Sequence, residues 1–492
     1  MRPLPLALRI TLGAQCLAMA APISNAAEIK NDDTLELASP ASLQQELNAQ
    51  QERVDGLKQR INSLEAQQFS PTTRMTMLVR SSAGGVNYSG NQINATANTW
   101  GQGEGAINLR NALTVNYDIM LFLDTSTTGK DLLRTILRMG NFGKSAFGVS
   151  GSGSASNPIF LTQLDEGFED PKGSNIVDIN RLFYSTPINQ YATVVFGPRL
   201  RQNDALPVWP TIYARPGSEL LLKIFTQAGS TSAYSLLIGP GAGLILKNRD
   251  QSAGWSAGIN YIAFNGFRGN PDDSVRDPGG MGSSGSAATA MAQASYTGQG
   301  WNLSLAAAQN GTGVRQDGTN FWRRLQPQFG SADQRQAGYN NKGITRAISL
   351  AGYWQPRRSG LIPSISAGVG FNQANLTNSS IQINRQPLKS IQSAGWLVGF
   401  TWDDAFASGN QFGAAIGQPT FVTSVNNEQA KDSNYAFEVY YKIQATDRII
   451  ITPALFYLSH PRGADTQAPG MPASPSPSFN ALGALVEFTL KI

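Results

Sequence analysis

The sequence predicts an all-β fold: a transmembrane antiparallel β-barrel of about 16 strands, preceded by a short coiled-coil helix. Two observations carry this prediction. Apolar and polar residues alternate in many segments separated by Gly-, Asn- or Ser-rich breaks, which is the period-two pattern of strands with two unlike faces. Trp and Tyr recur at the ends of these segments, where a barrel meets the membrane interfaces.

The clearest unit spans residues 435–458, where two alternating segments flank a short polar break. On its first strand, aromatic and aliphatic residues share one face, while Glu438 and Lys442 share the other. The last residues of the chain repeat the pattern, with Glu487 and Lys491 opposite an apolar face. We interpret this unit as a transmembrane β-hairpin that is repeated until a barrel closes.

Composition limits the alternatives. Only 14% of the residues are charged, 50 are Gly, and the mean hydropathy is −0.22. No run of about 18 apolar residues follows the N-terminus, so the sequence predicts no transmembrane helix. The formal net charge falls from +5 to +3 if Arg2 and Arg9 are removed with a signal peptide. Because the basic residues are also scattered, a nucleic-acid partner is not expected.

The N-terminal residues 1–26 have the pattern of a signal peptide: basic residues, an apolar stretch, and Ala26 at a cleavage site. Cys16, the only cysteine, lies inside this segment, so the mature chain is expected to lack thiols and disulfides. Residues 27–40 are expected to form a disordered spacer.

Residues 41–69 predict a coiled-coil helix. Its apolar residues fall at heptad positions a and d: Leu43, Leu47, Val54, Leu57, Ile61 and Leu64. An amphipathic helix packed on its own domain is the alternative, although the stripe has the narrow width of a coiled-coil seam. Val and Ile at a with Leu at d favour a dimer by pattern alone.

Residues 71–492 are predicted to form the barrel, with short turns alternating with long loops. The candidate strands include Leu220–Thr226 and Tyr234–Ile238. Ile107–Val115 and Tyr117–Leu123 are predicted as two separate strands. Leu132–Met139 fits a strand with Arg134 and Arg138 on one face, but the stretch also fits an amphipathic helix.

Several motifs make the chain recognisable. They are Leu64–Thr73, Asp124–Phe142, Val194–Ala214, Phe225–Leu246 and Gly409–Pro419, in this order. Together they resemble the cyanobacterial outer-membrane porins of the carbohydrate-selective porin family, often called iron-uptake porins. The resemblance implies a homotrimer in the outer membrane, in contact with lipid. Those porins usually carry a surface-layer-homology domain where this chain has only residues 27–40, so a peptidoglycan tether remains open.

A porin needs charged side chains around a water-filled constriction rather than catalytic groups. The candidate pore-lining residues are Arg199, Arg201, Arg134, Arg138, Lys223, Glu438, Lys442, Glu487 and Lys491. Lys223 is expected on a strand that follows the one carrying Arg199 and Arg201. An excess of lumenal Arg would favour anions or, with aromatic side chains, line a path for sugars. The alternative is that each is a generic lumen or loop residue.

Other chemistry-bearing residues do not form a catalytic set. Asp165, Glu166, Glu169 and Asp170 are expected in a solvated loop, with inward folding as the alternative. His460, the single histidine, is expected in a loop without a nucleophile elbow. We therefore expect no enzyme, no cofactor and no metal site.

The favoured function is a passive outer-membrane channel for small hydrophilic solutes, meaning inorganic ions including iron, and possibly sugars. The N-terminal helix would then lie in the periplasm. The alternative is a structural or adhesive envelope protein in which the helix is a stalk and a plugged barrel is the anchor.

Overall fold

The computed structural model describes residues 72–90, 111–148, 160–165, 167–170, 172–215, 221–247, 253–272, 278–311, 342–358, 360–378, 382–383, 386–461, 463–464 and 480–492. The chain divides into two compact units, Met1–Gln68 and Phe69–Ile492, and all described residues belong to the second. The predicted signal peptide, spacer and coiled coil lie outside the described residues. Within them, no helix is long and apolar enough to cross a membrane.

The described unit is an antiparallel barrel. Its first eight long strands are β1 (Thr73–Ser89), β2 (Thr114–Thr125), β3 (Leu132–Gly140), β4 (Asp178–Pro187), β5 (Ala192–Arg201), β6 (Ile238–Lys247), β7 (Gly254–Ala263) and β8 (Ala288–Gly298). The other eight are β9 (Trp301–Asn310), β10 (Lys342–Trp354), β11 (Ser364–Asn378), β14 (Ser390–Asp403), β15 (Gln411–Val425), β17 (Ala436–Gln444), β18 (Ile449–Ser459) and β19 (Asn480–Lys491).

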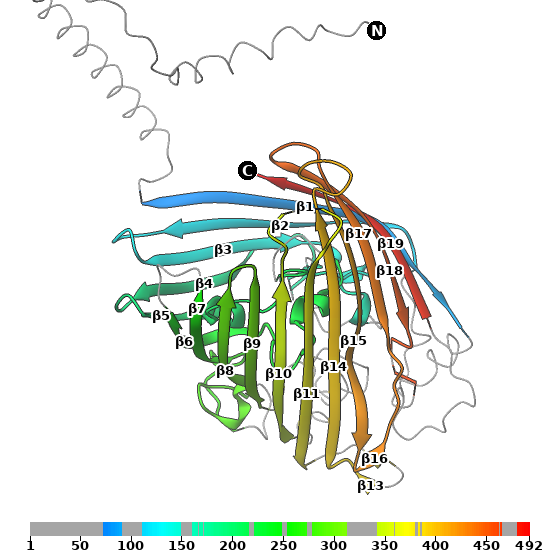
Figure 1. Ribbon diagram of the computed structural model, residues 1–492. Coiled ribbons are helices and arrows are strands. Elements are labelled where there is room, and N and C mark those ends of the chain that lie inside the picture. The colour runs from blue at the N-terminus through cyan, green and yellow to red at the C-terminus, as the bar shows by residue number, and fades with distance from the viewer. Residues whose placement is uncertain are drawn as a thin grey trace, which may run out of the picture. The chain divides into compact units, whose positions relative to one another are not determined.

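Each long strand pairs with its sequence neighbours, and β1 pairs with both β2 and β19. Figure 1 shows the blue β1 beside the red β19, where the sheet closes on itself. Three two-residue strands, β12 (Gln382–Ile383), β13 (Gln386–Pro387) and β16 (Glu428–Gln429), extend hairpins among the described residues. The predicted antiparallel barrel of about 16 strands is therefore confirmed.

The two faces of the wall follow the predicted alternation. On β17, Phe437 and Val439 are exposed outward, while Glu438 and Tyr440 are buried inside. The hairpin predicted over residues 435–458 is confirmed, because β17 and β18 pair across a short turn in which the Ala445 N–H donates to Ile449 O. An apolar outer face and a polar or small inner face suit a strand between lipid and the barrel interior.

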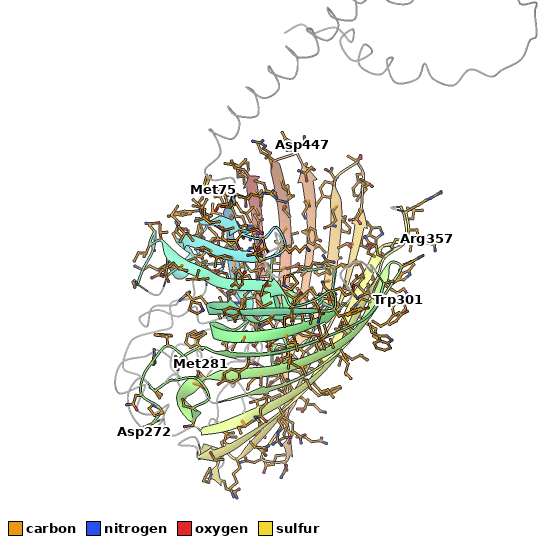
Figure 2. The ribbon with its side chains drawn as sticks, turned by 90° about the vertical axis from the view of Figure 1, so that its left-hand side faces the viewer. Met75, Asp272, Met281, Trp301, Arg357 and Asp447 are labelled. Atoms are coloured by element: carbon orange, nitrogen blue, oxygen red, sulfur yellow. The ribbon has the colours of Figure 1, made fainter. Side chains whose placement is uncertain are left out.

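Short turns and long connections alternate around the barrel, as predicted. Asp447 lies in the short turn between β17 and β18, and Arg357 in the one between β10 and β11. Asp272 and Met281 lie in the long connection between β7 and β8. Figure 2 shows Asp447 and Arg357 near one end of the barrel, with Asp272 and Met281 toward the other. In outer-membrane barrels the short turns face the periplasm and the long loops face outward.

Several boundary predictions are wrong. Tyr117–Leu123 and the end of Ile107–Val115 form one strand, β2, and the strand β6 was not among those predicted. Leu132–Met139 forms a strand, β3, which settles the alternative of a helix. The two stretches predicted as strands around residues 220–238 instead belong to a connection that leaves the wall, as described below.

Candidate functional site

The connection between β5 and β6 folds into the barrel interior where the structure describes it, at residues 202–215 and 221–237; we call these residues the β5–β6 segment. It includes the 3-10 helices η4 (Gln202–Ala205) and η5 (Lys223–Gln227). Gln202 Nε2 donates to Ala233 O within the segment, and Asn310 of β9 donates to Ser232 O. The predicted strand Leu220–Thr226 is wrong: Lys223–Thr226 belong to the 3-10 helix η5, so Lys223 lies on this segment rather than on a wall strand.

The β5–β6 segment reaches the far wall of the barrel. The backbone N–H groups of Ile212 and Tyr213 both donate to Ser366 Oγ of β11, at 3.0 Å each. Thr231 hydrogen-bonds to Thr420 of β15. A row of hydrogen bonds thus ties the segment to strands remote from β5 and β6, so the connection is an internal structure rather than an external loop.

Glu438 is the strongest single tie between this segment and the wall. Its carboxyl oxygens accept a hydrogen bond from Tyr213 Oη at 2.8 Å and another from the Leu222 N–H at 2.7 Å. Only 2% of Glu438 is exposed. Burial, and then the neighbouring Glu438, raises the pKa of the Tyr213 phenol well above its usual value, so the phenol stays protonated and donates.

Glycines on the wall leave room for the segment. A Cβ on Gly399 of β14 would overlap the ring of Tyr213, and one on Gly368 of β11 would overlap Ala228 O. The segment can therefore pack against the wall only where the wall residues are small.

The connection between β3 and β4 also folds inward at its described residues, 141–148, 160–165, 167–170 and 172–177; we call these residues the β3–β4 segment. It includes η2 (Phe142–Lys144) and η3 (Phe160–Thr162). Phe147 packs edge-to-face on Phe456 of β18, and Leu164 forms a β-bridge with Leu222 of the β5–β6 segment. Both segments and the inner faces of β14–β19 and β1 share one buried apolar cluster. The two segments therefore pack as one internal layer on this side of the barrel.

The acidic group predicted in a solvated loop lies in this layer instead. Glu169 is buried, and its carboxylate accepts hydrogen bonds from the Gly143 N–H at 2.6 Å and from Ser174 Oγ at 3.0 Å. Asp170 is also buried, and the Asp165 N–H donates to Leu221 O at 2.9 Å. Glu166 lies outside the described residues. The expectation of a solvated loop is wrong because the apolar residues around these carboxylates draw the segment inward.

Charged side chains lie on the neighbouring strands, β1–β5. We call Arg80, Arg134, Arg138, Arg181, Arg199 and Arg201, with the carboxylates beside them, the arginine row. Asp118 lies directly opposite Arg80 in the β1–β2 register and binds Arg138 bidentately, at 2.6 and 2.9 Å. Arg181 Nε donates to Asp204 at 3.0 Å, and Asp204 also accepts from the Arg201 N–H at 3.1 Å. The bidentate pairs hold the guanidinium groups in fixed orientations.

Two further pairs are more open. Arg134 and Asp124 lie directly opposite in the β2–β3 register and form two hydrogen bonds of 2.7 Å. Arg199 Nη2 lies 3.9 Å from Asp178, with 42% of the Arg199 side chain exposed. These side chains are therefore the more exposed members of the row.

The remaining predicted pore residues occupy different places. Glu487 faces inward and is buried, with Thr489 Oγ1 donating to it at 2.8 Å. Lys442 is half-buried near the short turn that follows β17, and Lys491 is exposed at the end of β19. A register irregularity between Gly197 and Leu200 also interrupts the period of two near Arg199 and Arg201. A pore-lining role for all nine residues remains a prediction.

Sequence reasoning missed Arg80, Asp118, Arg181 and Asp204 as members of this site. The alternation on β1 and β2 could have placed Arg80 and Asp118 on inner faces, but not opposite each other, because register depends on strand pairing. Among the described residues, no cluster of three or more His, Cys, Asp or Glu side chains is placed to hold a metal ion.

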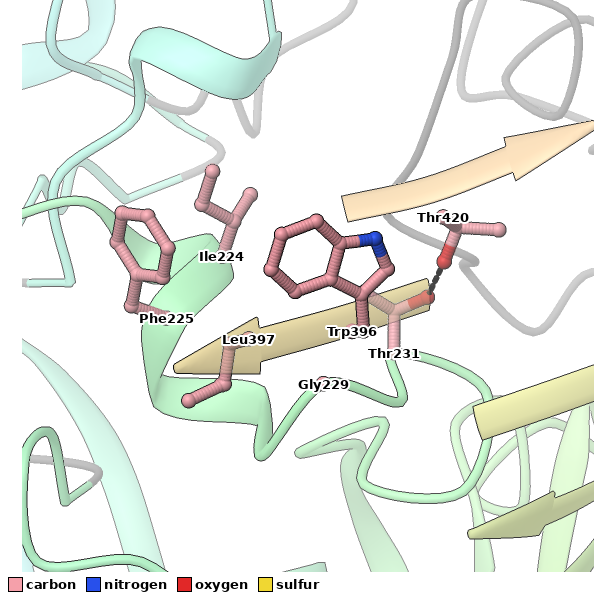
Figure 3. Close-up of a pocket in the computed structure, with 7 residues that line it drawn as sticks. All are labelled: Ile224, Phe225, Gly229, Thr231, Trp396, Leu397 and Thr420. Atoms are coloured by element: carbon pink, nitrogen blue, oxygen red, sulfur yellow. Dashed lines mark hydrogen bonds between the residues drawn. The ribbon is translucent and has the colours of Figure 1, made fainter. Parts of the chain in front are cut away.

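A small pocket marks where the β5–β6 segment meets the wall. It is lined by Ile224, Phe225, Gly229 and Thr231 of the segment and by Trp396, Leu397 and Thr420 of the wall (Figure 3). The lining is mostly apolar, so this pocket is a packing defect between layers rather than a path for hydrophilic solutes.

A closed barrel with an apolar outer face, short turns at one end and inward-folded connections is the architecture of outer-membrane β-barrel proteins. Residues 261–472 match the model of the family described as "Carbohydrate-selective porin, OprB family". This match confirms the porin resemblance seen in the sequence and indicates an outer-membrane location.

Relatives and solved structures are also similar to this chain. An uncharacterised protein of Synechocystis sp. is 28% identical over 440 residues, which cover 86% of this chain and 72% of the relative. An uncharacterised protein of Nostoc sp. is 25% identical, over 87% of this chain and 69% of the relative. Both relatives come from cyanobacteria.

Among solved structures, OprB of Pseudomonas putida at high pH has a TM-score of 0.45 and 12% identity, covering 86% of this chain and 94% of that one. The anion-selective porin of Comamonas acidovorans has a TM-score of 0.46 and 12% identity, covering 85% and 99%. The barrel assignment itself rests on the strand pairings, not on these likenesses.

Proposed function

We propose that this protein forms a water-filled channel for passive diffusion of small hydrophilic solutes across the outer membrane. The constriction lies between the arginine row on β1–β5 and the two inward-folded segments. The observation that supports this proposal is that charged pairs lie on β2–β5 and η4, beside an apolar layer that packs on β14–β19 and β1. Such a layer narrows the lumen, and fixed charges at a narrow point set the field that solutes cross.

The chemistry of the row favours anions and hydroxyl-rich solutes. Arginine presents up to five N–H donors in a planar fork, which suits carboxylate, phosphate and sugar oxygens. Arg134 and Arg199 keep 32% and 42% of their side chains exposed, so they are the groups that would meet a passing solute. We propose that they make the channel mildly anion-preferring, while Arg138 and Arg181 support the site from buried positions.

Reversal potentials in planar bilayers under a salt gradient test this assignment. Arg199→Ala, Arg201→Ala and Arg134→Ala are each expected to shift the reversal potential toward cation preference, because each removes a lumenal positive charge. Arg448→Ala, in the short turn between β17 and β18, is the matched control and is expected to change nothing. Unchanged selectivity in all three variants would remove the arginines from the mechanism.

Solute identity needs a separate measurement. We propose inorganic ions, including iron, and sugars as the candidate solutes, because both present oxygen-rich or charged surfaces to the row. Swelling of proteoliposomes in sugars of increasing size, measured beside uptake of salts and of iron, ranks these candidates. We also propose a homotrimer with its N-terminal helix in the periplasm, as the porin resemblance implies, and native mass spectrometry of the mature chain tests the oligomeric state.

A second function is favoured by one specific observation. The apolar cluster shared by both inward segments is large, and a barrel filled in this way could serve as an anchor for an envelope structure rather than as a channel. Single-channel recording separates the two proposals. Steady ohmic steps support the channel, whereas no conductance from folded protein supports the plugged anchor.

A further inference from the structure

The outer face of β9, β10, β11 and β14 is apolar over most of its height. These four strands are consecutive neighbours in the barrel (Figure 1). Toward the short turns, Trp301 lies opposite Trp354, which lies opposite Ile365. Further along the strands, Leu305, Leu350 and Val369 are aligned in the same way. Exposed aromatic and aliphatic residues in register are the expected surface for contact with lipid tails.

One polar row crosses the same face nearer the long connections. Arg346 of β10 lies directly opposite Gln309 of β9 and Gln373 of β11, and Gln373 lies directly opposite Gln392 of β14. We call these four residues the Arg346 row. Gln309, Arg346 and Gln392 are exposed, and Gln373 is half-buried. Ile344 and Ile348, on either side of Arg346 along the strand, are 43% and 50% exposed, which shows that Arg346 shares their outward face.

Arg346 has no ion-pair partner within the part of the chain that the structure describes. The side-chain amides of Gln309 and Gln392 likewise have no hydrogen-bond partner among the described residues, and Gln373 bonds only to its own strand, at Ala374 O and Asn375 Oδ1. An arginine on a lipid-facing wall is costly at the bilayer centre and tolerated near an interface. Its position along the strand therefore decides what it can meet.

Eight residues separate Arg346 from Trp354 on β10, which is about 26 Å along a strand and about 20 Å along the membrane normal at a typical tilt. The apolar band of such barrels is about 25 Å tall. With Trp354 at the inner interface, the Arg346 row lies about 5 Å inside the outer edge of such a band, a distance that the long arginine side chain can span by extending toward the headgroups. The charged and oxygen-rich groups available there are the headgroups of outer-leaflet lipids.

We propose that the Arg346 row binds the phosphate-bearing headgroup of an outer-leaflet lipid. The Arg346 guanidinium pairs with the phosphate, for which its planar fork is suited. The flanking amides donate to and accept from neighbouring hydroxyl and carbonyl groups of the same headgroup. This site goes beyond the proposed channel, because it lies on the lipid-facing surface and involves no lumenal residue.

The test uses the full mature protein, purified in mild detergent, and diphosphoryl lipid A as the probe. Bound lipid is counted by native mass spectrometry over a titration, with fully dephosphorylated lipid A and inorganic phosphate as separate arms. Arg346→Gln removes the charge and keeps a polar side chain. Arg357→Gln is the matched control, because Arg357 lies at the opposite end of β10 and bonds to Gln299. Heat-modifiable migration on a gel verifies that each variant is folded.

We expect Arg346→Gln to weaken binding of diphosphoryl lipid A about ten-fold or more, with no change in Arg357→Gln. Dephosphorylated lipid should bind both variants and the native protein equally weakly. If Arg346→Gln does not fold, Arg346→Lys and Gln309→Ala are measured, and each should weaken binding by a smaller factor. Equal affinity across the variants overturns the proposal, as does equal binding of the two lipids. Inorganic phosphate competing as well as lipid would also overturn it, since a lipid site needs the acyl chains as well.

Discussion

The hydrogen bonds of Glu438 predict how firmly the constriction is held. Glu438→Ala removes the acceptor of both the Tyr213 phenol and the Leu222 N–H. Glu487→Ala is a matched control, because Glu487 is an equally buried inner-wall carboxyl whose hydrogen-bond donor among the described residues, Thr489, lies on its own strand. The two substitutions delete the same atoms from the same face of the barrel. Only the first releases the β5–β6 segment.

The expected loss of docking free energy follows from the two hydrogen-bond donors that are left without an acceptor. A buried donor without an acceptor costs about 1–3 kcal/mol, so two such donors cost about 2–6 kcal/mol. The segment keeps its hydrogen bonds to Ser366 and Thr420, so part of its docking to the wall survives. We therefore expect the free energy of docking to weaken by an amount in the lower half of this range. A loss of about 3 kcal/mol raises the undocked population roughly a hundred-fold.

Single-channel recording in planar bilayers measures this population. Glu438→Ala should show more open-channel noise, and brief steps to a higher conductance as the segment leaves the wall. Tyr213→Phe, which removes one of the two donors, should show a smaller effect in the same direction. Glu487→Ala should record like the native protein. Identical traces for Glu438→Ala and Glu487→Ala would refute the idea that this carboxyl holds the constriction.

Three other perturbations follow from the described contacts. Asp131 accepts hydrogen bonds from the hydroxyl and N–H groups of the β2–β3 turn, and those from Thr128 and then Thr127 lower its pKa. Because the pKa of Asp131 is lowered in the folded state, its carboxylate stabilises the fold above the unfolded pKa of about 3.9, and this stability is lost as pH falls through the folded pKa. The thermal midpoint should therefore drop in acid, and the drop should be smaller in Asp131→Asn. An equal drop in the two proteins would contradict the idea that Asp131 stabilises the turn. Gly399→Ala should cost about 1–3 kcal/mol by driving a methyl group into the Tyr213 ring, whereas Gly360→Ala has nothing within 4 Å and should leave the thermal midpoint unchanged. Asp118→Asn should lower the free energy of unfolding by about 3–5 kcal/mol, because it leaves the charge of Arg138 uncompensated. A chemical denaturation midpoint equal to that of the native barrel would argue against a stabilising role for this ion pair.

Local pattern was a sound guide to the wall of the barrel. The alternation at Phe437, Glu438 and Val439 predicts which side chains face outward, because a strand can bury only one face at a time when the other meets lipid. Strand ends were harder to predict. β6 was missed because Gly239, Gly241 and Gly243 occupy the inner positions, where the alternation has no large side chain to reveal it.

The same pattern failed inside the barrel. Leu222, Ile224 and Phe225 form a short apolar run that fits a strand, yet they lie on the β5–β6 segment. Short apolar runs are buried equally well in a wall or in an internal layer, so local sequence cannot separate the two. The acidic residues near Glu169 were wrongly predicted in a solvated loop. Burial of Glu169 depends on the Gly143 N–H, a donor 26 residues away that local sequence does not reveal.

The sequence by itself indicated a barrel with a lipid-facing surface, and it placed Glu438 and Glu487 on inner faces. These properties depend on neighbours two residues apart. Tertiary structure alone decided that Asp118 binds Arg138, that Glu438 holds Tyr213, and that the Arg346 row lies in register. Each of these depends on strand register or on the path of a long connection, and the free energy that selects them comes from contacts between residues far apart in the chain.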